Sequence, residues 1–215
     1  MGSRGMIKLS ASLYAADPLR LADNIDSVSS YVDSFHIDIM DGWFSPEFGL
    51  YGRLVEHIQD YTKVPLDVHL MLRHPMNAAI RFSEMGVRSV AFHLEGDHCS
   101  SEIAAAIKSN GARAFAAIRH GTHVSQLEQV TDFADGFLFL TAPAGGGPFD
   151  ENAFKRLSAR PPGLQTVVDG KIDPSHFGRL AELHVETAVV GAAMFSHGNN
   201  ARRASELAAL IGPSG

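Results

Sequence analysis

The chain is poor in cysteine and in basic charge, and it contains no long apolar run. Cys99 is the single cysteine among 215 residues, which excludes an internal disulfide and a metal cage built from several thiolates. The 18 basic residues are outnumbered by 24 acidic ones, and a net charge of -6 is unsuited to binding a nucleic-acid backbone. No stretch of about 18 apolar residues is present to span a membrane, and no secretory signal is visible. We therefore expect a cytoplasmic protein with neither a nucleic acid nor a membrane as partner.

What the sequence does contain suits one globular domain. Hydrophobic residues make up 45% of the chain, and 215 residues are enough to bury a large core. The first five residues, Met1–Gly5 (MGSRG), resemble the remnant of an expression tag. We therefore expect a single domain over residues 6–215.

Short apolar or β-branched runs recur along the chain, each separated from the next by about one strand-plus-helix unit. Between them, Asp17-Pro18, Asp173-Pro174 and Asn199-Asn200 are typical helix starts, and Gly86 and Gly111 are typical helix ends. This alternation without a linker predicts an α/β fold, a single (β/α)8 or TIM barrel. An open doubly wound sheet is disfavoured because no Gly-x-Gly-x-x-Gly motif follows the first run. The predicted strands are Ile7–Ser12, Ser34–Ile39, Leu66–Met71, Ser89–His93, Ala114–Ile118, Gly136–Leu140, Leu164–Asp169 and Glu186–Val190.

Alternation within the strands predicts which side chains face the barrel axis. In the second and third runs, apolar residues alternate with polar residues and methionines. If the apolar residues face the outer helices, the alternating set faces inward, near the carboxyl-terminal mouth where barrel enzymes place their chemistry. A polar side chain inside a barrel is costly unless it is paired or liganded. The inward set is His36, Asp38, Met40, His69 and Met71, and Asp169 ends the seventh run just before Gly170.

Two imidazoles and two carboxylates are therefore expected to converge at one end of the barrel. A lone buried histidine is more often a hydrogen-bonded core residue than a ligand, but four such groups at matching strand ends favour a ligand set. Nitrogen and oxygen ligands of this kind suit a divalent zinc, manganese, iron or cobalt ion better than calcium. The four residues are His36, Asp38, His69 and Asp169.

Several motifs resemble those of the ribulose-phosphate 3-epimerase family, that is, ketose-phosphate 3-epimerases. Residues 35–42 (FHIDIMDG), followed by residues 43–46 (WFSP), are similar to its second-strand signature, and residues 66–71 (LDVHLM) to its third-strand motif. Weaker similarities cover the first, seventh and eighth strands, from Ser10-Ala-Ser12 through Val168-Asp-Gly170 to residues 191–195. The resemblance extends from Met6 to about Phe195 and implies a barrel of the ribulose-phosphate-binding type.

The resemblance implies a metal-dependent isomerase of carbohydrate metabolism that epimerises a ketose phosphate at C3, most directly D-ribulose 5-phosphate to D-xylulose 5-phosphate in pentose phosphate conversion. It assigns His36, Asp38, His69 and Asp169 to the metal, and Asp38 and Asp169 also to acid–base catalysis. The expected substrate contacts are Ser12, His69, Met40 and Met71. The metal charge and burial should move the pKa values of the two carboxyl groups apart.

The phosphate end departs from the family pattern. The loop over residues 141–149 is shorter and lacks the family's glutamine, Lys171 follows the seventh-strand Asp-Gly where the family has another glycine, and Ala192 replaces a serine. We expect backbone N–H groups there to surround an anion pocket. Lys171 either binds the phosphate or narrows the pocket. The residues expected around the pocket are Gly145, Gly146, Gly147, Gly170, Lys171, Gly191 and Ala192.

Other interpretations stay open. A related ketose phosphate, such as allulose 6-phosphate or a tetrulose phosphate, is an alternative substrate, and a non-catalytic sugar-phosphate-binding barrel is a more remote one. A decarboxylase of a related barrel is disfavoured because Asp67-Val-His69 lacks the lysine of the Asp-x-Lys motif. His93 and Glu95 are candidates to contact the ligands, and Arg119 and His120 to meet substrate. We expect a small-molecule sugar phosphate as partner and a homo-oligomeric assembly.

Overall fold

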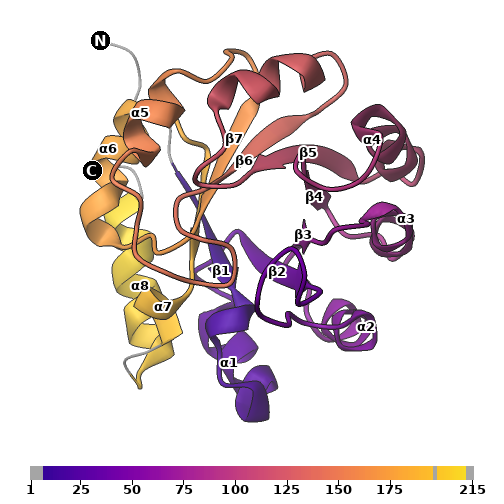
Figure 1. Ribbon diagram of the computed structural model, residues 1–215. Helices are drawn as coiled ribbons and strands as arrows, with labels where there is room; N and C mark the ends of the chain where they lie inside the picture. The colour runs from indigo at the N-terminus through magenta and orange to yellow at the C-terminus, as the bar shows by residue number, and fades with distance from the viewer. Residues whose placement is uncertain (1–6, 196–197, 212–215) are drawn as a thin grey trace.

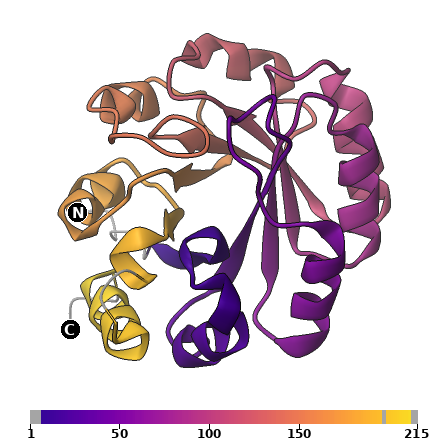
Figure 2. The same cartoon turned by 60° about the horizontal axis from the view of Figure 1, so that its bottom comes forward.

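The chain folds into a closed barrel of eight parallel strands surrounded by helices (Figure 1, Figure 2). The structure, a computed structural model, describes residues 7–195 and 198–211, so the predicted tag remnant lies outside the described residues. The strands follow one another in chain order and β1 pairs with β8, which closes the barrel and confirms the predicted TIM-barrel fold. They are β1 (Lys8–Ser12), β2 (Ser34–Met40), β3 (Leu66–Met71), β4 (Ser89–His93), β5 (Arg113–Ile118), β6 (Gly136–Leu140), β7 (Gln165–Asp169) and β8 (Thr187–Val190).

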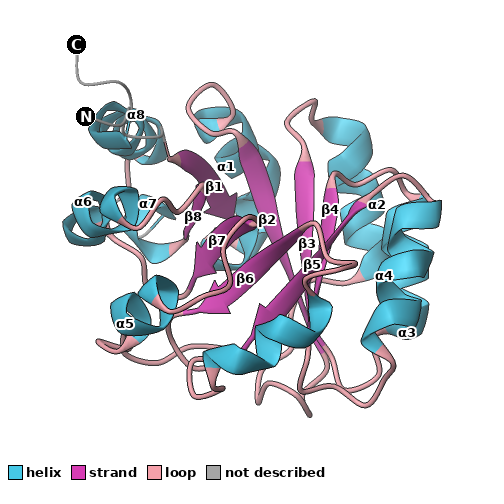
Figure 3. Ribbon diagram, turned by 90° about the horizontal axis from the view of Figure 1, so that it is seen from above, coloured by secondary structure: helices cyan, strands magenta, loops and turns pink. Residues whose placement is uncertain are grey.

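Helices cover the outside of the barrel (Figure 3). Asp173 begins one of them with a capping box that includes the side chain of His176, as the Asp-Pro signal predicts. Asp17 instead caps a single 3₁₀ turn, Pro18–Arg20, and the first α-helix begins just after it. After β5 the connection is a 3₁₀ segment, Val124–Val130. The α-helices are α1 (Leu21–Val28), α2 (Gly52–Tyr61), α3 (Met76–Glu84), α4 (Ser100–Ser109), α5 (Ala153–Ser158), α6 (Pro174–Glu182), α7 (Ala192–Phe195) and α8 (Asn200–Ile211).

The main core lies between the strands and the helices, where the outward residues of each strand are buried. Phe35 of β2 and Phe92 of β4 are fully buried there, and truncating such a side chain to alanine costs about 3–5 kcal/mol. None of the helices in the described ranges is long and apolar enough to cross a membrane.

The barrel interior is layered along its axis. An apolar layer containing Phe115 and Leu138 fills the middle, and a second apolar cluster containing Met40, Met71 and Leu140 lies toward the carboxyl-terminal mouth. At the opposite end, acidic side chains accept hydrogen bonds from strand backbone N–H groups. Asp33 accepts from Leu9, Asp135 from Ala114 and Glu186 from Thr166, at 2.6 to 2.9 Å. The inward polar groups of β2, β3 and β7 thus lie between the apolar cluster at the mouth and the hydrogen-bonded opposite end of the barrel.

Candidate metal and acid–base site

Two histidines and two aspartates from three strands meet inside the barrel. His36 and Asp38 lie on β2, His69 on β3 and Asp169 at the end of β7. The parallel register places Asp38 directly beside His69 and Met40 beside Met71, so the inward residues of both strands share one level. One ligand atom from each of the four residues lies within 4.8 Å of the others. The structure thus brings together the four residues that the sequence singles out.

The distances between these atoms fit a divalent metal ion. His36 Nε2 lies 3.2 Å from Asp38 Oδ1 and 3.4 Å from Asp169 Oδ2, and His69 Nδ1 lies 3.3 and 3.2 Å from the same two oxygens. The two nitrogens are 3.3 Å apart. Four ligands at about 2.0–2.1 Å from a tetrahedral ion would be roughly 3.3–3.4 Å from one another. Asp38 Oδ1 is buried without a hydrogen-bond partner in the described chain, as a ligand atom would be.

Two further groups determine which nitrogen of His69 faces the cluster. His93 Nδ1 lies 3.1 Å from Glu95 Oε2, and His93 Nε2 lies 2.9 Å from His69 Nε2. Since a carboxylate only accepts, His93 donates from Nδ1, its Nε2 accepts, and His69 donates from Nε2. In a neutral ring this leaves Nδ1 of His69 without a proton and therefore able to act as a metal ligand, whereas without a metal the two carboxylates favour a proton on Nδ1. Histidine ligands of metals are commonly oriented by such partners.

The two carboxyl groups and the two imidazoles shift one another's pKa values. Burial alone would raise the pKa of Asp38 and of Asp169, but the adjacent histidines, His36 above all, outweigh burial and lower both. Burial would lower the pKa of His36, but both carboxylates raise it well above its ordinary value, and the pKa of His69 is raised as well. Both carboxyl pKa values fall because both groups face the same pair of imidazoles, and the expectation that a bound metal ion moves the two values apart stays a prediction.

The carboxylates reach a cavity of about 580 Å³ at the carboxyl-terminal mouth. Ser12 Oγ donates a 2.8 Å hydrogen bond to Asp38 Oδ2, which orients that carboxylate. Met40, Met71 and Leu140 line the cavity as an apolar wall, and Asp38 and Asp169 are accessible from it. His69 is fully buried and does not line the cavity, so it reaches a bound molecule only through the cluster.

The residues predicted for the phosphate end lie around the same cavity, with one exception. Gly147 is not among its lining residues, and a side chain at this position would meet the Pro143 ring. Lys171 adopts a left-handed backbone with φ of 58°, so it retains the conformation that favours the family's glycine while adding a charged side chain. The predicted residues that do line the cavity are Gly145, Gly146, Gly170, Lys171, Gly191 and Ala192.

Arg119 lies in the loop after β5. Its side chain contacts the β2–α2 loop and does not line the cavity. Its guanidinium lies 3.7 Å from the centre of the Phe44 ring and donates to the Phe44 carbonyl at 2.6 Å. Asp41 accepts from the backbone N–H groups of Trp43 and Phe44 and so shapes the same β2–α2 loop. The Asp41-Gly-Trp43 sequence is a turn signal that points to this role. His120 does not line the cavity either.

Tyr14 is a cavity residue that sequence reasoning did not find. It follows β1 in a 3₁₀ turn, and burial together with the charges of Glu47 and Asp38 raises its pKa. No motif distinguishes a tyrosine at this position from a surface residue.

The sequence comparisons agree on one family. The model of the "Ribulose-phosphate 3 epimerase family" matches residues 8–195. Ribulose-phosphate 3-epimerase of Mycobacterium tuberculosis (strain H37Rv) is 30% identical over 203 residues, covering 90% of this chain and 88% of the relative. The Aquifex aeolicus enzyme of that name is 26% identical over 197 residues, covering 87% of this chain and 89% of the relative.

Solved structures agree on the barrel. KGPDC from Streptococcus mutans superposes with a TM-score of 0.79 at 13% identity, covering 96% of this chain and 97% of that one. 3-Hexulose-6-phosphate synthase from Salmonella typhimurium gives 0.74 at 16% identity, covering 95% and 98%. At such identities these two matches support the fold alone. The family model, matched from β1 to α7 and across all four clustered residues, places this chain in the ribulose-phosphate 3 epimerase family.

Proposed function

We propose that this chain is a metal-dependent C3 epimerase that interconverts D-ribulose 5-phosphate and D-xylulose 5-phosphate. Family membership makes it an isomerase of the carbohydrate epimerase type, acting on a ketose phosphate. The observation that carries the finer proposal is the pair Asp38 and Asp169, two carboxylates on strands separated by β1 and β8 that open into one cavity beside two histidines. Inversion at a carbon next to a carbonyl needs one group to remove a proton and another to return one.

In this proposal His36, Asp38, His69 and Asp169 hold one divalent metal ion, of the zinc, manganese, iron or cobalt kind. The ion would supply positive charge that stabilises the enediolate formed when C3 loses its proton, a contribution of several kcal/mol. The distances of 3.2 to 3.4 Å between each histidine nitrogen and both carboxylate oxygens support the assignment.

The carboxylates of Asp38 and Asp169 move the proton. One removes it from C3 on one face of the substrate, and the other delivers a proton to the opposite face. Ser12 keeps Asp38 in position through its 2.8 Å hydrogen bond. Met40 and Met71 present apolar, polarizable surface to the planar intermediate and keep water away from it.

The phosphate of the substrate is proposed to bind in the same cavity, on the side away from the two carboxylates. Gly145, Gly146, Gly170 and Gly191 have no side chain to obstruct their backbone N–H groups, and Lys171 adds a positive charge. Because this end differs from the family pattern, a ketose phosphate of another length, such as allulose 6-phosphate or a tetrulose phosphate, is the second candidate substrate.

Isotope exchange tests the proposal. The purified protein, loaded with each metal in turn, is incubated in heavy water with ribulose 5-phosphate, allulose 6-phosphate and a tetrulose phosphate. Deuterium should enter C3 of ribulose 5-phosphate and xylulose 5-phosphate should accumulate. If none of the three compounds exchanges with any metal, the proposed activity is refuted. If only another ketose phosphate exchanges, that compound and not ribulose 5-phosphate is the substrate.

We also propose that the chain acts in the cytoplasm as a homo-oligomer. The β2–α2 loop exposes three large aromatic side chains, Trp43, Phe48 and Tyr51, at 79%, 75% and 64%. Exposed apolar surface of this kind is common at subunit contacts. Light scattering of the purified protein would determine the oligomeric state, and a monomer at micromolar concentration would contradict this part of the proposal.

A further inference from the structure

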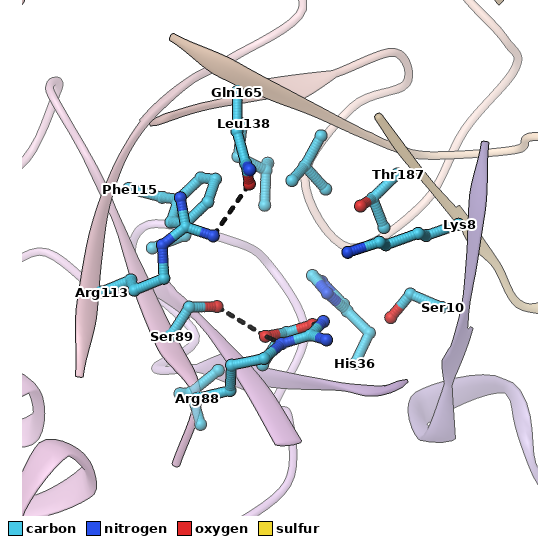
Figure 4. A pocket seen from close by; sticks show the side chains of 14 residues that line it. Lys8, Ser10, His36, Arg88, Ser89, Arg113, Phe115, Leu138, Gln165 and Thr187 are labelled. Carbon is cyan, nitrogen blue, oxygen red and sulfur yellow. Dashed lines mark hydrogen bonds and ion pairs between the residues drawn. The ribbon is translucent and has the colours of Figure 1, made fainter. Parts of the chain in front are cut away.

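A second cavity, of about 90 Å³, lies at the amino-terminal end of the barrel. Residues from all eight strands or their starts line it, so it lies on the barrel axis, at the end away from the mouth. Figure 4 shows polar side chains directed inward around an open centre, with the ring of His36 among them. The proposed epimerase mechanism makes no use of this cavity.

The charge around the cavity is predominantly positive. Arg88 forms a two-point ion pair with Asp67, which also accepts a 2.6 Å hydrogen bond from Ser89 Oγ, so this carboxylate is fully engaged. Arg113 donates to Gln165 Oε1 and to the Asp135 carbonyl. Within the described ranges, neither Arg113 nor Lys8 forms an ion pair. Three cations and one carboxylate thus line the cavity of a protein whose overall charge is -6.

The carboxylates nearest the strand starts do not balance this charge. Asp33, Asp135 and Glu186 bind backbone N–H groups and are not among the residues that line the cavity. Figure 4 shows the amino group of Lys8 and the guanidinium of Arg113 directed toward the same open centre. Two such cations repel each other unless an anion lies between them.

His36 contributes an unused polar atom to the cavity. Its side chain is 2% exposed, and the ion pairs and hydrogen bonds that it makes in the described chain all use Nε2. The other ring nitrogen, Nδ1, therefore needs a partner from the cavity that the ring lines. When Nε2 serves as a metal ligand, Nδ1 carries the proton and donates it to that partner.

We propose that this amino-terminal cavity binds a small tetrahedral oxyanion of the inorganic phosphate or sulfate type, between Lys8 and Arg113 and against Nδ1–H of His36. A volume of about 90 Å³ holds several water molecules or one such anion, and it is too small for a sugar phosphate. Charge-assisted hydrogen bonds favour the anion over water. By accepting from Nδ1 of His36, the anion keeps the lone pair of Nε2 directed at the acid–base cluster.

Thermal unfolding of the full chain, as purified, tests this site. Sulfate at 10 mM is compared with chloride at the same ionic strength, and we expect sulfate to raise the Tm by about 2–4 °C, a shift ordinary for about 1 kcal/mol of binding in a domain of this size. Lys8→Met should remove the part of the shift that this cavity contributes, and because the Lys8 side chain has no hydrogen bond or ion pair to lose in the described chain, the variant should fold normally. Arg113→Met should also reduce the Tm shift that sulfate causes.

Matched controls separate this site from the mouth. Lys63→Met removes an exposed lysine that lies outside the cavity, and it should keep the sulfate shift. Lys171→Gly alters the proposed phosphate end at the mouth, where sulfate is expected to bind as well, and it should keep the part of the shift that depends on Lys8. No shift in the parent chain would mean that the cavity holds water only, and a shift of the same size in Lys8→Met and in the parent chain would place the anion elsewhere. Either result overturns the proposal, whatever the outcome of the isotope-exchange test.

A crystal soaked in selenate locates the anion directly. We expect an anomalous peak between Lys8 and Arg113, within hydrogen-bond distance of His36 Nδ1. A peak only at the mouth, beside Lys171, would overturn the proposal.

Discussion

His93 Nε2 lies 2.9 Å from His69 Nε2, and through this contact Glu95, which lies outside the cluster, controls the nitrogen that His69 presents to the carboxylates. Glu95 is held in turn by hydrogen bonds from the Arg119 backbone and from Thr122 Oγ1. The loop after β5 therefore orients His69 through the side chains of Glu95 and His93. His93 and Glu95 are positioning residues, because neither lines the mouth cavity.

The first prediction concerns metal affinity. His93→Leu removes the acceptor for His69 Nε2–H and should weaken metal binding by about 10–100-fold, whereas His93→Gln retains an oxygen acceptor and should recover part of the loss. Competition with a metal-binding dye measures the affinity. Equal affinities for both variants and the parent protein would show that His93 only fills space.

The second prediction concerns catalysis. Asp38→Asn and Asp169→Asn should each reduce epimerisation by about 10²–10⁴-fold or more, because each variant lacks one of the two proton-transfer groups. Metal content is measured alongside, since both residues are also proposed ligands. A variant that turns over at the parent rate with metal bound would remove its residue from the acid–base pair.

The third prediction separates two roles of Lys171 with two substitutions. Lys171→Met removes the charge but keeps the bulk, and Lys171→Gly removes both. If the lysine binds phosphate, both changes should raise KM by about tenfold or more with kcat nearly unchanged. If its bulk narrows the pocket, only Lys171→Gly should improve activity on ribulose 5-phosphate. Unchanged kinetics in both variants would exclude both roles.

The fourth prediction concerns acid stability. Burial alone would raise the pKa of Glu95, but hydrogen bonds with His93, Thr122 and the Arg119 backbone outweigh it and lower the pKa to about 2, below the ordinary value of 4.5. A group whose pKa is lower in the folded state stabilises the fold above the unfolded pKa. This contribution is therefore present above pH 4.5 and is lost as the pH falls toward 2.

Glu95→Gln tests this relationship. The substitution should cost about 1.5–3 kcal/mol of unfolding free energy at pH 7, and the difference from the parent protein should shrink as the pH falls below 4.5. Urea unfolding followed by circular dichroism at several pH values measures it. Glu84→Gln, at an exposed helix position, is the control and should change little at any pH. A cost independent of pH would mean that the charge of Glu95 contributes nothing.

The barrel and the identity of the four clustered residues follow from local sequence patterns. Strand alternation is a local property with a period of two residues, so the direction of a side chain such as His36, Asp38 or His69 follows once the strand is recognised. The predicted runs Leu66–Met71 and Gly136–Leu140 coincide with β3 and β6. The family motifs around Asp38 and His69 lie within those local patterns, which is why the expectation and the family match agree.

The construction of the loops and of the two ends of the barrel depends instead on long-range packing. Arg119 reaches Phe44 across 75 positions of sequence, and no local pattern encodes such a contact. The left-handed backbone of Lys171 and the position of Gly147 against the Pro143 ring depend likewise on what packs around them. The amino-terminal cavity joins Lys8 to Arg113 because the barrel closes on itself. Local periodicity therefore specifies which residues face inward, and barrel closure and loop packing specify which of them meet.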